Sequence, residues 1–157
     1  MVNSPSSRTF PEFNLARLLK TVFEPKHGQR IGILIDLEDP KQITDFAFLD
    51  DPELTIQRHA HDVFYLGLKN GALAELGLVG GELFAYQITG GSNLDLPDVA
   101  WTPAGRQVSL AQEVYPTFDI LLCISTFSAT APLTASAKQF GFRGATLHGV
   151  NPIILCT

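Results

Sequence analysis

The sequence predicts an α/β fold, namely a three-layer Rossmann-like or flavodoxin-like domain with a mostly parallel sheet of about four to five strands. Two observations lead to this prediction. Continuous aliphatic runs recur along the chain, and segments with helical apolar spacing separate them. The chain has 157 residues, the length of one average domain. We therefore expect a flexible N-terminus over residues 1–12 and a single α/β domain over residues 13–157.

The first helix and the first strand have clear signals. Residues 13–24 place apolar side chains on one helical stripe, with Asn14 as a candidate N-cap and Pro25 as the stop. Residues 30–36 form an aliphatic run that ends in Asp36. Such a run is typical of a central strand covered on both faces.

A long helix is expected after an acidic loop. Residues 37–52 contain several acids and two prolines, which predicts a loop with a short helical turn at 42–46. Asp51 precedes Pro52 as a cap would, and apolar side chains recur with helical spacing from there to about residue 77. Gly67 and Gly71 weaken the helical pattern, so two helices are the alternative.

The rest of the chain alternates in the same way. We expect a strand at 82–89, a polar loop to 105, a short helix at 108–114, a strand at 120–125, a helix beginning at Ser128 or Thr130 and ending at Gly141, and a strand at 143–148. Right-handed crossovers then give a parallel sheet. The expected strand order is 2-1-3-4, with the switch point between the carboxyl ends of strands 1 and 3.

Charge and composition bear on the possible partners and location. The formal net charge is −5, with acids gathered in residues 36–53, which argues against nucleic acid as a partner. No apolar stretch approaches the roughly 20 residues of a membrane span, and residues 1–8 lack a signal-peptide core. Cys123 and Cys156 do not suggest a disulfide framework. We expect a cytoplasmic protein that binds neither nucleic acid nor membrane.

Known catalytic motifs are not found. The residues after the first strand are acidic and lack the glycine-rich turn that would bind a dinucleotide. His59 and His61 lie two residues apart on an expected helix, where they cannot share one ion, so we expect exposed helix histidines. No nucleophile motif surrounds the serines. We therefore assign no catalytic residue, no metal ligand and no cofactor to this chain.

Candidate ligand-binding residues lie at the expected carboxyl edge of the sheet. They are Asp36, Ser125, Thr126, Ser128 and His148. The carboxyl ends of parallel strands meet at one edge, where ligands of open α/β sheets bind. The hydroxyls could hold a small anion at a helix N-terminus. Plain capping by the hydroxyls, and a structural role for His148, are the alternatives.

The loop that begins at Gly90 and Gly91 is longer than the usual strand-to-helix connection. Its glycines would let the backbone approach a ligand or a partner closely. A surface turn at 90–98 is the alternative. A homo-oligomeric structural subunit, with Trp101 and this loop buried against a second copy, is a further hypothesis.

Four segments resemble the N-terminal domain of the thermophilic leucyl-type metallo-aminopeptidase family. They are the strand at 28–36, the aspartate-led strand and Ser/Thr-rich turn at 118–128, the alanine-rich helix segment at 134–138, and the strand motif at 141–150. The match covers most of the chain in order. Residues 36–53 and 90–98 depart from the family pattern.

The resemblance implies a non-catalytic domain that contributes to a cleft and to interdomain contacts. Members of the family are two-domain hydrolases that use a pair of divalent metals, and their ligands belong to a second domain. The partner would then be a C-terminal catalytic domain, and any divalent metal would lie in that downstream domain. A small-molecule-binding α/β module is the alternative function.

Overall fold

A computed structural model describes residues 14–148 and 154–156, and within these residues it contains one seven-stranded sheet in the order β4-β3-β2-β1-β5-β6-β7. The four longest strands run parallel at its centre: β1 (Arg30–Leu37), β2 (Val79–Gln87), β5 (Ile120–Ser125) and β6 (Arg143–His148). Three short strands pair antiparallel outside them: β3 (Val99–Trp101), β4 (Gln107–Ser109) and β7 (Ile154–Cys156).

The predicted α/β class and the order of the four main strands are confirmed, because the expected order 2-1-3-4 corresponds to β2-β1-β5-β6. The predicted count of four to five strands is wrong. Each of the additional strands has three residues, which is too short for an alternating apolar pattern to show. The expected polar loop after β2 thus contains β3, and the expected helix at 108–114 begins with β4.

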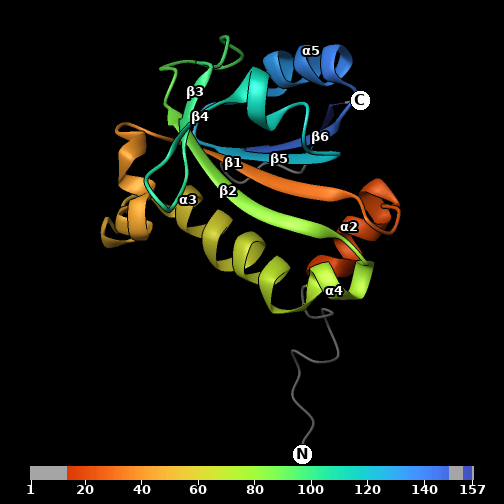
Figure 1. Cartoon of the computed structure of the whole chain (residues 1–157). Helices are drawn as coiled ribbons and strands as arrows, with labels where there is room; N and C mark the ends of the chain where they lie inside the picture. The colour runs from red at the N-terminus through yellow and green to blue at the C-terminus, as the bar shows by residue number, and fades with distance from the viewer. Residues whose placement is uncertain (1–13, 149–153, 157) are drawn as a thin grey trace, which may run out of the picture.

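Helices cover both faces of the sheet (Figure 1). On one side lie α2 (Leu15–Phe23), α3 (Thr55–His59) and α4 (Leu73–Leu76). On the other lies α5 (Thr130–Phe140). No helix of the described ranges is long and apolar enough to cross a membrane.

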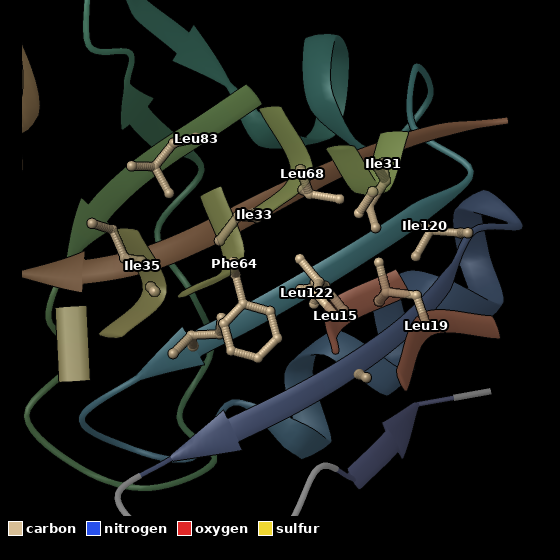
Figure 2. Close-up of a cluster of buried hydrophobic side chains, with 14 of the residues drawn as sticks. Leu15, Leu19, Ile31, Ile33, Ile35, Phe64, Leu68, Leu83, Ile120 and Leu122 are labelled. Atoms are coloured by element: carbon tan, nitrogen blue, oxygen red, sulfur yellow. The ribbon is translucent and has the colours of Figure 1, made fainter. Parts of the chain in front are cut away.

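The larger core lies under α2 and α3 and takes alternate residues of the central strands. Ile31, Ile33 and Ile35 of β1 point to this side, as Figure 2 shows, and each is fully buried. They pack with Leu15 and Leu19 of α2, Phe64 and Leu68 of the helical segment after α3, Leu83 of β2, and Ile120 and Leu122 of β5.

The second core lies on the α5 side and takes the residues between those of the first. Leu34 of β1, Leu121 and Cys123 of β5 and Leu133 of α5 belong to it. Burial on both faces explains why the central strands are continuous aliphatic runs rather than alternating ones.

The long helix predicted from residue 52 begins three residues later. Asp51 does not cap it; its Oδ1 accepts a hydrogen bond from the backbone N–H of Glu53 in the preceding turn. The helical path then runs through α3, the π-helical segments η2 (Ala60–Tyr65) and η3 (Leu68–Ala72), and α4, with a kink at Gly71. The first helix matches its prediction, because Oδ1 of Asn14 accepts from Arg17 N–H at 3.0 Å.

The acidic connection after β1 is more ordered than the predicted loop. It forms η1 (Pro40–Asp50), two short 3-10 turns with a kink at residues 44–46. Asp45 and Phe46 have left-handed φ values of 51° and 59°. The backbone N–H of Asp45 donates to Pro103 O at 2.9 Å, which ties this kink to the loop between β3 and β4. A second short helical segment, η4 (Leu110–Val114), follows β4.

We predict that Gly32→Ala destabilises the fold, because an added Cβ would lie 2.8 Å from the ring of Phe118 and 3.2 Å from Leu121. The expected loss is about 1–3 kcal/mol of unfolding free energy, measured by urea denaturation. In a Phe118→Leu background the same change should cost clearly less. Equal costs in the two backgrounds would show that contact with Phe118 does not fix this position.

Candidate functional site

A buried carboxylate joins the ends of the two central strands. Asp36, near the end of β1, is 1% exposed. Its Oδ1 and Oδ2 accept from the backbone N–H of Thr126 at 2.9 and 3.0 Å, and its Oδ2 also accepts from that of Phe127 at 3.4 Å. Thr126 follows β5 directly. The carboxylate therefore bridges β1 to the turn after β5, at the predicted switch point.

Gln57 completes this arrangement from α3. The side chain is 2% exposed, and its Nε2 donates to Oδ1 and the backbone O of Asp36, both at 2.8 Å, and to Oγ1 of Thr126 at 2.9 Å. Sequence reasoning missed Gln57, since a lone glutamine in a helical pattern carries no motif. The signal that could have identified it is its position, two residues after the start of a helix that faces the carboxyl edge.

The environment of Asp36 points to a structural role. Burial raises the pKa of this carboxyl above its usual 3.8, while hydrogen bonds from Thr126, Gln57 and Phe127 oppose the rise. A general base must reach the proton that it abstracts. The Asp36 oxygens are instead occupied by N–H donors of the same chain.

The five candidate binding residues do not form one cluster. Among the five, a hydrogen bond links Asp36 to Thr126. Ser125 is buried and donates its hydroxyl to Phe127 O at 2.7 Å. His148 ends β6 opposite Ser125, and its Nδ1 is buried without a partner among the described residues. Ser128 belongs to a separate group of hydroxyls, in which its Oγ lies 3.1 Å from that of Thr130.

The N-terminus of α5, where we expected a possible anion site, is held by the long loop after β2. Oδ1 of Asn93 accepts from the backbone N–H of Ala131 at 3.0 Å, and the backbone N–H of Asn93 donates to Ser128 O at 2.7 Å. The N-cap residue is Ala129, which provides no side-chain cap, so neither Ser128 nor Thr130 is the N-cap, although Oγ of Ser128 accepts from the backbone N–H of Thr130 at 3.4 Å. Residues 90–98 thus supply the cap from outside the helix.

A hollow of about 880 Å³ opens beside Asp36, between the end of β1, η1 and the start of α3. Every charged residue that lines it is acidic: Asp36, Glu38, Asp39, Asp50, Asp51 and Glu53. Apolar lining comes from Phe48, Leu54, Ile56 and Ile88. One oxygen each of Asp39 and Asp51 accepts a local backbone N–H, from Lys41 and Glu53. The carboxylates of Glu38, Asp50 and Glu53 form no hydrogen bond within the described part of the chain.

These acids are too dispersed to chelate one ion. Among residues 14–148 and 154–156, no group of three or more His, Cys, Asp or Glu side chains is placed to hold a metal. His59 is exposed as expected. The expectation is wrong for His61, whose side chain is 13% exposed and stacks on Tyr65 with ring centroids 5.6 Å apart. Its Nδ1 lies 2.8 Å from Oδ1 of Asp62.

Comparison with known proteins adds no relative. No family model matches the chain, and neither a curated protein nor a solved structure matches it. The geometry of the carboxyl edge is therefore the basis for the function proposed below.

We predict that Asp36→Asn lowers the unfolding free energy by about 1–3 kcal/mol, because the amide would turn one NH₂ group toward buried N–H donors. The folded pKa of Asp36 is raised, so the folded state binds more protons than the unfolded state just above pH 3.8. The Asp36 contribution to stability must then fall as the pH rises through the folded pKa. The deficit of the variant should accordingly shrink as the pH rises.

Urea denaturation at several pH values between about 3 and 7 measures this, with Asp95→Asn as the control. Asp95 is an exposed acid that forms no hydrogen bond with its side chain within the described residues, so its replacement should leave the pH dependence unchanged. A deficit of Asp36→Asn that grows with pH would contradict the raised pKa.

Proposed function

We propose that this chain is a non-catalytic binding domain whose ligand is a small organic cation held in the acidic hollow at the end of β1. The observation that carries the proposal is the composition of this hollow. It lies at the switch point of the sheet, and its charged lining is acidic throughout. Ligands of open α/β sheets bind at this position.

The size and chemistry of the hollow favour an amine with an aliphatic body over a bare metal ion. Its volume lies within the range of about 300–1,000 Å³ for small-molecule sites. The dispersed carboxylates suit charges spread along a flexible chain, because each can meet one ammonium group. Phe48, Ile56 and Ile88 would contact the methylene groups between these charges.

A non-catalytic role is supported by the hydrogen bonds that the buried carboxylate of the hollow already forms within its own chain. The Asp36 carboxylate, the one charged group in the hollow that is shielded from water, accepts hydrogen bonds from its own chain. The remaining acids are exposed to solvent, whereas a general acid or base usually lies in a desolvated cleft. The hollow can therefore attract and hold a cation without a reactive group beside it.

Spermidine is a suitable probe, because it is a flexible aliphatic polyamine. We predict that isothermal titration calorimetry detects its binding and that Glu38→Gln, Asp50→Asn and Glu53→Gln together weaken it about 5- to 30-fold. Binding should also weaken as the salt concentration rises.

The matched control neutralises three acids elsewhere, with Glu24→Gln, Glu75→Gln and Asp95→Asn. It changes the net charge by the same amount and should leave the affinity nearly unchanged. Equal losses in the two triple variants would show that spermidine responds only to net charge, and absence of binding by the unmodified chain would also refute the proposal.

A second candidate is the N-terminal domain of an aminopeptidase-like protein, on a Rossmann-like or flavodoxin-like architecture. What favours it is that the resembling segments are adjacent in space, since they provide β1, β5, α5 and β6. Residues 149 and 150 of the last segment lie outside the described residues. The carboxyl edge would then face a C-terminal catalytic domain, and the acidic hollow would form one wall of the substrate cleft in a cytoplasmic protein. We also propose an alternative assembly, in which copies of this chain associate as a homo-oligomer.

Reading the gene downstream of Thr157 tests this candidate. We expect a segment with histidine and glutamate metal ligands, and the longer product should release leucine from leucine p-nitroanilide when divalent metal is present. The 157-residue chain should not do so under the same conditions. A stop codon directly after Thr157 would contradict the candidate.

A further inference from the structure

A second, apolar hollow adjoins the acidic hollow at Ile88. This residue directly follows β2 and lines both spaces. The apolar hollow has a volume of about 320 Å³ and lies between the end of β2 and the loop that leads to β3. Its apolar lining consists of Ile88, Leu94, Leu96 and Pro97. A ligand in the acidic hollow is thus bordered by apolar surface on the Ile88 side.

Two polar contacts hold the hollows next to each other. The backbone N–H of Ile88 donates to Leu37 O at 2.9 Å. Nε2 of Gln87, which lines the apolar hollow, lies 3.5 Å from the backbone O of Glu38, which lines the acidic one. The end of β2 is therefore fixed against the segment that follows β1, and the two hollows keep a common border.

Leu94 is the most open side chain of the apolar hollow. It is 51% exposed, the largest exposed fraction among the large apolar side chains that the structure describes. A single exposed leucine is ordinary on a protein surface. Here, however, Leu94 lies with Leu96, Pro97 and Ile88 around one concave space, and grouped apolar surface of this kind is typical of a binding site.

The loop holds this apolar surface in place without a ligand. Asn93, directly before Leu94, is bonded to the first turn of α5 through its backbone and its side chain. Oγ1 of Thr89 donates to Gly91 O at 2.9 Å, and Leu96 packs against the core on the α5 side. Binding in a hollow that is already formed has a smaller ordering cost.

The two hollows differ in charge. Six acids line the acidic hollow, whereas Asp95 is the one charged residue that lines the apolar hollow. Asp95 is exposed, so its carboxylate can stay in water beside an apolar group. A ligand that matches both hollows has its positive charge at one end and an apolar chain at the other.

We propose that the cation held in the acidic hollow carries an alkyl chain, which crosses Ile88 and lies on Leu94, Leu96 and Pro97. This inference rests on the function proposed above and names its ligand class as an alkylated polyamine. The ammonium groups meet the carboxylates of the acidic hollow, and removal of the chain from water adds affinity. The chain also distinguishes this ligand from plain polyamines, which match the acidic hollow alone.

The probe is N-octylspermidine, compared with spermidine by isothermal titration calorimetry below the concentration at which the octyl compound forms micelles. Each methylene group that is fully removed from water strengthens binding roughly fourfold, so partial burial of the octyl chain should strengthen it at least about tenfold. In NMR spectra, the methyl signals of Leu94 and Leu96 should shift with N-octylspermidine and hardly shift with spermidine.

Leu94→Ser should remove most of the gain that the octyl chain provides. It should leave the affinity for spermidine unchanged, which also shows that the variant is folded. Leu66→Ser is the matched control, because Leu66 is 36% exposed and lines neither hollow. This control should keep the full gain.

The outcomes separate the inference from the function on which it rests. If spermidine binds and the octyl chain adds nothing, the inference is wrong and the proposed function stands. Equal loss of the gain in the two leucine variants also overturns the inference, because the chain would then adsorb to any exposed apolar side chain. If neither compound binds, the proposed function itself fails, and the inference fails with it.

Discussion

The buried carboxylate of Asp36 is the interaction on which the carboxyl edge of this protein depends. It lies where the two central strands end, and it accepts hydrogen bonds from the turn after β5 and from α3 at once. A charge taken out of water is costly unless donors surround it. Here the backbone N–H groups of Thr126 and Phe127 and the amide of Gln57 provide them. One side chain thereby fixes three segments that are far apart in sequence.

The same anchoring determines which groups of the hollow face solvent. With Asp36 fixed by its own chain, the remaining acids of the hollow lie on η1 and on the turns around it, exposed to solvent. They create a negative potential at the switch point while the core beneath stays apolar.

The central strands and their order could be predicted because burial on both faces leaves a continuous aliphatic run, as in Ile31 to Ile35. The site was only partly predictable. Asp36 was recognised, since an acid that ends such a run must lie at the carboxyl edge. Gln57 and Asn93 were not, because their roles come from contacts with residues 21 or more positions away, which no local pattern records. The three-residue strands were not predicted for a related reason. They are defined by their pairing with neighbouring strands and not by a local residue pattern.

The most direct measurement is the hydrogen exchange rate of the Thr126 backbone amide, followed by NMR. Thr126 is an exposed residue in a turn, and such an amide would ordinarily exchange fast. Because it donates to the buried Asp36 carboxylate, we predict protection close to that of the β5 core amides. Exchange as fast as that of other exposed turn residues would contradict the account, since the strand ends would then not be joined through Asp36.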